Sequence, residues 1–547
     1  MYVAVVPNRN SPPAILLREG YREDGKAKTR TLANITHWKS ERIDALTRAL
    51  KGEFDGLVGE DVDPTTDRIY GVLFILKELA DRAGVTKALG KTPMGRLALF
   101  LVLARIADQG SRLSAVRWAE DHCVEEILGL DEFDEEDLYR AMDWLSARQD
   151  RIEKKLYRAY AKKKGSPNIL VLYDVTSSYL EGQCNEFAEY GFDRDKKKGK
   201  KQIVIGLLTG SDGEPLSVKV FKGNSSDPTT VSTQIDTLKK RFGVEDVVFV
   251  GDRGMVKSKG KQALAQCGFK YITALTNAQV RKLINEKVIQ LDLFDTTVCE
   301  VEQGSLRFIL RRNDAVCRKE AKRREDKVDR LNELLAKRNA FVLTSLRADP
   351  KTGLRNLTDW AVRHKVSSFV SLCLDNRRIV LTVDEQAKSD AAMLDGCYVL
   401  ESDVSARQMD TKTVDQRYRS LQQVERDFRT LKNGFLEIRP VFVRKRTRTS
   451  AQVFITMLAL KIVRLAEQLL KQAYCSDEGS TYDFRLKDAL RIMSRLCFSR
   501  YQIQIKHIEF LRLPRLDDRQ MAVCADLEIR PPSNRSSARL SAVAKSL

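Results

Sequence analysis

Histidine and paired cysteines are scarce in this chain of 547 residues. The four histidines, which are His37, His122, His364 and His507, lack the spacing of metal ligands. The ten cysteines stand singly and form no C-x-x-C motif. This excludes a zinc module of the usual spacing and a disulfide framework, and it is typical of a reduced cytosolic protein.

Long apolar runs are also missing. The most apolar stretches, Leu97–Ala104 and Val453–Leu460, are shorter than a bilayer span, and Arg105 and Lys461 follow them directly. The first residues, MYVAVVPNRNSPP, lack the apolar core of a signal peptide. We therefore expect a soluble protein in a bacterial or archaeal cytosol.

Basic residues are abundant. Lys and Arg number 95 against 75 Asp and Glu, so the formal net charge is +20, and the sequence pI is about 9.4. Such an excess favours a polyanionic partner, nucleic acid before an anionic membrane surface. Hydrophobic residues make up 43% of the chain, enough for the two to four domains that its length predicts.

The first part of the chain, residues 1–164, is predicted to be a region for DNA binding or dimerisation. Short strands are expected at Tyr2–Val6, Ala14–Glu19 and Thr29–Asn34, and helices from Ser40 to about Lys164. Residues 165–276 then alternate strand and helix patterns in the order β-β-β-α-β-α-β, which is typical of a mixed α/β layer. The expected strands are Asn168–Val175, Gln202–Leu208, Leu216–Phe221, Asp246–Val250 and Tyr271–Leu275.

The second half is predicted to interrupt and then complete this layer. Residues 277–402 form a β-rich insertion with a charged helix at Asp314–Arg338, and residues 403–474 carry helices at about Val414–Lys432 and Ser450–Ala473. Residues 475–547 form a C-terminal region. Its tail after Arg530 has few apolar residues and is predicted to be disordered.

Three acidic residues stand out by their positions. Asp174 interrupts the apolar run NILVLYDV, Asp252 follows the strand VVFV, and Glu425 lies in the helix YRSLQQVERDFRTLK. A carboxylate inside a buried strand is costly unless it is paired or bound to a cation. Taken singly, a strand-end Asp is more often a cap and a helical Glu more often a solvated charge. Together they indicate a site for Mg²⁺, which prefers carboxylate oxygens.

The helix supplies a second pattern. Tyr418, Glu425 and Lys432 are spaced by seven and seven residues. At about 100° per residue, seven residues drift by only about 20°, so all three share one face of a continuous helix. An exposed helix with chance spacing is the alternative interpretation.

These residues resemble the DDE-class insertion-sequence transposases, which have an RNase H-like core. The branch concerned has a Tyr-x2-Arg-x3-Glu-x6-Lys signature and a β-rich insertion before the Glu. Leu421 stands where that signature has Arg. Arg419, Arg426 and Arg429 are the candidates to replace it.

The resemblance extends to the motifs around the aspartates. YDVTSSYLEG is similar to the first-Asp strand of this family, GDRGM to its second-Asp motif, and KGNSSD, which contains Asn224, to the loop between them. The separations are 252 − 174 = 78 and 425 − 252 = 173 residues, which leaves room for a large insertion. The resemblance implies a multidomain α/β protein whose RNase H-like catalytic core is interrupted by the insertion.

The activity that the resemblance implies is metal-dependent DNA transposition. Asp174, Asp252 and Glu425 would bind two Mg²⁺ ions, with Mn²⁺ as a substitute, and serve both cutting at the element's ends and joining of a 3′-hydroxyl to target DNA. The partners would be double-stranded DNA and further copies of the chain, in a dimer or larger assembly. Rival interpretations are a nuclease of the same fold without strand transfer, and a DNA-binding regulator.

Further residues are candidates for placing the DNA backbone. Tyr418 and Lys432 suit phosphate positioning rather than metal binding, since neutral phenol and ammonium are poor Mg²⁺ ligands. Two basic clusters, KKKGKK and RKRTR, could contact phosphates or be plain solvated surface. The full candidate set for DNA contacts is Tyr418, Lys432, Arg253, Arg429, Asn224, Lys198, Arg444 and Arg446. Trp360 in the insertion could hold a flipped base, but a core position is favoured.

Overall fold

The computed structural model describes residues 1–9, 12–53, 62–165, 169–182, 184–192, 199–244, 247–253, 255–290, 294, 298–345, 347–433, 435–438, 441–474, 484–503, 508–532 and 536–540. The chain divides into two compact units: residues 1–75, 117–127 and 469–547 form the first, and residues 76–116 and 128–468 the second. Among the described residues, no helix is long and apolar enough to span a membrane.

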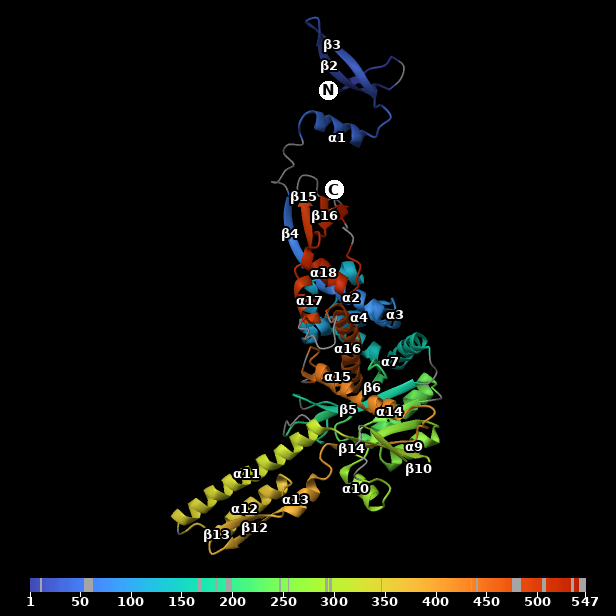
Figure 1. The fold of residues 1–547 in the computed structure, drawn as a ribbon. Helices are drawn as coiled ribbons and strands as arrows, with labels where there is room; N and C mark the ends of the chain where they lie inside the picture. The colour runs from blue at the N-terminus through green and yellow to red at the C-terminus, as the bar shows by residue number, and fades with distance from the viewer. Residues whose placement is uncertain are drawn as a thin grey trace. The chain divides into compact units, whose positions relative to one another are not determined.

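The first unit begins with a small antiparallel sheet in the order β1-β2-β3, followed by helix α1 (Figure 1). The bounds are β1 Tyr2–Val6, β2 Ala14–Glu23, β3 Lys26–Asn34 and α1 Ser40–Leu50. Asp24 and Gly25 both have positive φ, as a tight two-residue hairpin requires, so β2 and β3 extend further than predicted. The three predicted strands are confirmed.

A second sheet of this unit pairs segments that are far apart in sequence, in the order β17-β16-β15-β4. Its strands and helices are β4 Val62–Ile69, α17 Leu486–Met493, β15 Cys497–Ile503, β16 Ile508–Arg512, α18 Asp518–Asp526 and β17 Ser536–Leu540. Strand β4 lies where only helices were expected, and β17 lies in the tail predicted to be disordered. The expectation of helices alone was wrong, because pairing with a distant strand supplies backbone hydrogen bonds that local composition does not reveal. The prediction of a disordered tail is contradicted only by β17, since residues 533–535 and 541–547 lie outside the described residues.

The stretch from residue 71 to residue 164 is helical, as predicted. Its helices are α2 Gly71–Arg82, α3 Val85–Leu89, α4 Pro93–Ala107, α5 Arg112–Glu120, α6 Val124–Leu128 and α7 Glu135–Lys164. The long helix α7 begins with a capping box at Asp134 and Asp137. Near its end, Tyr157 and Tyr160 belong to the same hydrophobic core as Tyr173 and Phe249 of the central strands. This helix, placed in the N-terminal region by the sequence, is therefore packed as part of the core.

The second unit is built on an eight-stranded sheet in the order β10-β11-β14-β9-β8-β5-β6-β7. Strand β5 pairs parallel with β8, and β8 parallel with β9, whereas β5, β6 and β7 form an antiparallel meander. The order of the first five core strands, 3-2-1-4-5, is that of an RNase H-like fold, so the predicted fold class is confirmed. The bounds are β5 Ile169–Tyr179, β6 Gln202–Gly210, β7 Pro215–Lys222, α8 Asp227–Asp236, the π-helical turn η1 Thr237–Phe242, β8 Val247–Gly251, α9 Ser258–Gln266 and β9 Lys270–Ala274.

Part of the predicted insertion continues this sheet instead of forming a sheet of its own. Strand β14 pairs with β9 and carries β11 and β10 beyond it. Burial explains the extension: Phe308, Leu310 and Val399 of these strands pack with Val280 of the adjacent helix. The bounds are α10 Asn277–Asn285, β10 Cys299–Gln303, β11 Leu306–Arg312 and β14 Cys397–Ser402.

The remainder of the insertion has a separate small core. Figure 1 shows its long charged helix beside a second helix and a two-stranded sheet, in yellow and orange. The core residues Leu331, Leu357, Phe369 and Ile379 come from all of these elements. The bounds are α11 Asp314–Thr344, α12 Pro350–Arg363, β12 Val370–Asp375, β13 Arg378–Val383 and α13 Glu385–Ala392.

The helix predicted at 414–432 is divided in two. Helix α14 spans Thr411–Arg419, and α15 spans Leu421–Asn433. Between them the hydroxyl of Ser420 donates to the carbonyl oxygen of Gln416 over 3.1 Å, a back-bond that bends helices. The expectation of one continuous helix was therefore wrong. The apolar helix that follows is α16, Arg446–Tyr474.

Candidate active site

Asp174 lies within the central strand β5. Tyr173 and Val175 on either side of it are buried, while Asp174 itself is half-buried. Its Oδ1 accepts the backbone N–H of Val175 over 2.7 Å. Both faces of a sheet with parallel strands are usually covered, so an ionised carboxylate here is costly unless it is hydrogen-bonded, paired or bound to a cation.

Asp252 follows the end of the neighbouring strand β8. Because Tyr173 pairs with Gly251 in the parallel register, Asp174 and Asp252 occupy equivalent positions one residue further along. Adjacent strands are about 4.8 Å apart, so the two carboxylates start from neighbouring backbone positions. This edge, at the carboxyl ends of β8 and β9, is where ligand sites form in α/β sheets.

Glu425 is exposed on α15, which packs against β5. The helix presents a buried stripe at three- and four-residue spacing, made of Leu421, Val424, Phe428 and Leu431. At about 100° per residue, Glu425 lies at one border of that stripe. The packing of the stripe therefore decides where Glu425 is held relative to β5.

Tyr418 links helix α14 to the aspartate that follows strand β8. Its hydroxyl donates to Oδ1 of Asp252 over 3.2 Å. Burial raises the pKa of Tyr418, and the negative charges of Asp252 and, more weakly, Glu425 raise it further. The aromatic hydroxyl is therefore a fixed neutral donor to an aspartate, despite the break at Ser420.

The structure brings these acidic residues to one region but does not close a cage around a cation. Within the described ranges, no group of three or more His, Cys, Asp or Glu side chains is close enough to hold a metal ion. The donors are nevertheless of the right chemistry, because all three side chains offer hard carboxylate oxygens. The metal-binding roles of Asp174, Asp252 and Glu425 stay a prediction.

Asp427 faces away from Glu425, at the opposite border of the buried stripe. It is 2% exposed, and Nη1 of Arg464 lies 2.7 Å from each of its oxygens. Gln423 donates to the same carboxylate over 3.1 Å, and Nη2 of Arg464 donates to the carbonyl oxygen of Asp212. This carboxylate fastens α15 to α16 and to the β6–β7 turn, so its role is structural.

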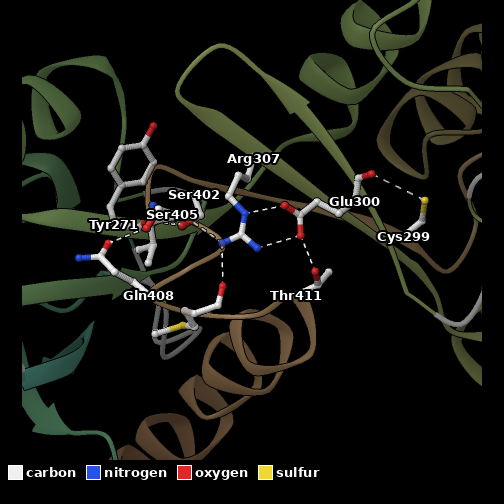
Figure 2. Close-up of polar contacts among 10 residues, drawn as sticks. Tyr271, Cys299, Glu300, Arg307, Ser402, Ser405, Gln408 and Thr411 are labelled. Carbon is white, nitrogen blue, oxygen red and sulfur yellow. Dashed lines mark hydrogen bonds and ion pairs between the residues drawn. The ribbon is translucent and has the colours of Figure 1, made fainter.

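A second anchor fixes the segment that leads into α14 (Figure 2). Nη2 of Arg307 donates to Glu300 over 2.8 Å, and its Nη1 donates to the carbonyl oxygens of Val404 and Met409, each over 2.8 Å. Thr411, the first residue of α14, donates to the same Glu300 carboxylate. The ion pair lowers the pKa of Glu300. Sequence reasoning missed this cluster, because charged residues on strands are usually solvent-facing and only strand pairing buries Arg307.

The other predicted contact residues are dispersed over the second unit. Arg253, Arg429, Arg444 and Asn224 are exposed, and Asn224 follows β7 at the same end of the sheet as the end of β5. The guanidinium of Arg446 lies 4.9 Å from the ring centre of Phe187. Lys432 is half-buried near the end of α15. Lys198 lies outside the described residues.

Trp360 packs within the small core of the insertion. It is partly buried against that core and stacks on His364 with ring centres 3.9 Å apart. This supports the favoured interpretation of a core tryptophan.

Two family models, both of transposases, match this chain and carry its family assignment. The model of the family described as "Transposase DDE domain" matches residues 165–462, more than half of the chain. The model described as "IS1634 family transposase, N-terminal domain" matches residues 3–60. No curated protein matches. The solved structures that match include one described as "Cryo-EM structure of piggyBac transposase synaptic complex with hairpin DNA (SNHP)", at 11% identity and a TM-score of 0.32, covering 80% of this chain and 82% of that chain. The chain therefore belongs to the insertion-sequence transposases with a DDE domain.

Proposed function

We propose that this transposase works by a cut-and-paste route, cutting DNA at the ends of its element and joining the freed 3′-hydroxyl to target DNA. The observation that carries the proposal is the parallel register that places Asp174 and Asp252 side by side, with Glu425 on the helix packed against β5. A pure DNA-binding protein has no need of three carboxylates at such an edge.

Asp174, Asp252 and Glu425 would hold two Mg²⁺ ions, or Mn²⁺ in their place. When bound, such ions supply Lewis-acid stabilisation to the attacking and leaving oxygens at phosphorus. Tyr418 keeps Asp252 oriented through its hydrogen bond. Lys432 and Arg429, on the same helix as Glu425, would hold a phosphate by charge rather than by metal coordination.

The same site would serve both steps, since each is an in-line displacement at phosphorus. In cutting, water attacks the phosphodiester, the bond to the 3′-oxygen breaks, and that oxygen leaves as a 3′-hydroxyl. In joining, this hydroxyl attacks a target phosphodiester and displaces the 3′-oxygen of the target strand. Two ends must be held together for this sequence, so a dimer or larger assembly on double-stranded DNA is part of the proposal.

The test uses the full chain, duplexes carrying the terminal repeats of the element, a target duplex and Mg²⁺, with both strands mapped. Cut ends with a free 3′-hydroxyl and joined products, both lost on chelation with EDTA, are the expected result. Cutting without joining would replace the proposal with a structure-specific nuclease. Selective binding without any cutting would replace it with a regulator.

A further inference from the structure

A basic hollow lies at the carboxyl ends of β8 and β9, directly beside Asp252. It encloses about 310 Å³ and is lined by residues of the loop after β8, the first turn of α9 and the end of β9. Arg253, the residue after Asp252, forms part of its wall. The hollow therefore adjoins the candidate active site.

Positive charge dominates the wall. Arg253 and Lys257 are exposed and form no ion pair with any other described residue. Lys261 also lines the hollow and pairs with Glu401 over 2.6 Å. The charge of Lys261 is therefore neutralised by Glu401. Two cations are left to attract an anion.

The first turn of α9 adds backbone donors. This nine-residue helix begins at Ser258, and its N-cap residue Lys257 makes no side-chain capping hydrogen bond. The first N–H groups of a helix have no partner within the helix, and they carry the positive end of its dipole. A helix start of this kind is suited to a phosphate group. The start of α10, in contrast, is closed by a capping box between Thr276 and Gln279.

A buried hydroxyl in the wall also lacks a partner. Thr273 is 2% exposed and lines the hollow, yet its Oγ1 forms no hydrogen bond within the described part of the chain. In the sheet, Thr273 on β9 is the register partner of Gly251 on β8 and of Glu401 on β14. Leaving a buried hydroxyl unsatisfied is costly, so such a group in a cavity points to a ligand that completes it.

We propose that this hollow binds a phosphate of the DNA backbone, held by Lys257, the first turn of α9 and the hydroxyl of Thr273. This inference rests on the proposed function, since it assigns one strand of the DNA substrate to the wall beside Asp252. Its effect would be to fix the register of that strand next to the reacting phosphodiester, where a misplacement of about 1 Å can cost on the order of 100-fold in rate.

Two variants and a matched control test the site. Lys257→Ala removes one cation and Thr273→Val removes the hydroxyl at constant shape. Lys259→Ala is the control, because Lys259 is an exposed lysine of the same helix turn that does not line the hollow. Thr273→Val should not lower the midpoint of thermal unfolding, since it removes an unpartnered buried hydroxyl.

The measurement is equilibrium binding, without metal, to end duplexes in which single phosphates are replaced by neutral methylphosphonates. Wild type and Lys259→Ala should lose roughly tenfold in affinity at one or two positions. Lys257→Ala and Thr273→Val should bind the unmodified duplex more weakly and be insensitive at those same positions. If every methylphosphonate position that weakens binding of wild type also weakens binding of Thr273→Val, the inference is wrong.

A measurement with inorganic phosphate distinguishes a site for a DNA backbone phosphate from a site for free phosphate. If phosphate raises the unfolding midpoint of wild type but no backbone position matters, the hollow is a site for free phosphate and the DNA assignment is overturned. The proposed function is tested separately. If the protein cuts and joins DNA but methylphosphonate replacement weakens binding at no position, only this inference is wrong. If such a position exists but the protein neither cuts nor joins DNA, only the proposed function is wrong.

Discussion

The hydroxyl of Tyr418 donates a hydrogen bond to Oδ1 of Asp252 over 3.2 Å, across 166 residues of sequence. The same oxygen accepts the backbone N–H of Arg253 over 2.7 Å. One oxygen of Asp252 is thus oriented by two donors, while the other accepts no hydrogen bond from the residues that the structure describes. In the proposed site, the second oxygen of Asp252 would be the one that binds the cation.

Tyr418→Phe should lower the single-turnover rate of cutting by roughly tenfold and leave DNA affinity unchanged, since a hydrogen bond to a charged group is lost. Because burial and then Asp252 raise the pKa of Tyr418 above its ordinary value, the hydroxyl stays protonated through mildly alkaline pH. The ratio of wild-type to variant rate should therefore be constant between about pH 7 and pH 9. A ratio that falls toward one in this range would contradict the assigned donor role.

Replacing Asp174, Asp252 or Glu425 singly by Ala should abolish both cutting and joining. DNA binding should persist, because it rests on many Lys and Arg contacts spread over the surface. Loss of one of several clustered carboxylates relieves repulsion, so the unfolding midpoint should stay level or rise. Asp236→Ala is the control, as Asp236 is an exposed carboxylate at the end of α8. Activity retained in a triad variant, or lost in Asp236→Ala, would refute the assignment.

Asp427→Ala should destabilise the protein by about 3 kcal/mol or more, because it leaves the guanidinium of Arg464 without its partner in a mostly buried setting. Activity should fall as a consequence of the displaced helix. The double variant Asp427→Leu/Arg464→Met should recover most of the stability, since removing both charges removes the unpaired one. Urea unfolding of the three proteins is the measurement. An Asp427→Ala protein as stable as wild type would show that the clamp contributes nothing.

Arg307→Met should loosen the segment between β14 and α14 and reduce cutting more than DNA binding, because Tyr418 lies on α14. The pair with Arg307 lowers the pKa of Glu300, so its contribution to stability is present above the ordinary Glu pKa and is lost as pH falls through the lowered value. The gap in unfolding midpoint between wild type and Arg307→Met should therefore be wide at pH 7 and narrow at about pH 3. An equal gap at both pH values would exclude this ion pair as the source.

The strands β2 and β3 should contribute to selective recognition of the element's ends. Lys26, Lys28 and Arg30 are exposed on β3, within the N-terminal region predicted to serve DNA binding or dimerisation. Replacing all three by Ala should reduce binding to terminal DNA more than binding to an unrelated duplex. The pair Lys239→Ala/Lys240→Ala, exposed on η1, is the control. A truncation near Lys164 is unsuitable, because α7 packs into the core through Tyr157 and Tyr160. An equal loss on both duplexes would exclude the selective role.

The sequence by itself determined the elements whose pattern is local. Alternation and apolar runs placed β5 and β8, so the positions of Asp174 inside a strand and Asp252 at a strand end could be predicted. Spacing along α15 also separates Asp427 from Glu425, because two residues turn a helix by about 200°, and Asp427 is buried while Glu425 is exposed. These conclusions depend only on periods of two and about 3.6 residues, which any short window contains.

Tertiary structure decided everything that depends on pairing between distant segments. The register of β5 with β8, the extension of the sheet by β14, β11 and β10, and the strand β4 in a helical stretch could not be read from local periodicity. Nor could the burial of Asp427 against Arg464, or of Arg307 against Glu300. A sequence does not distinguish a charged side chain that is solvated by water from one that is paired with another residue. Only the packing of the elements against one another determines which, because burial removes water and makes the partner necessary.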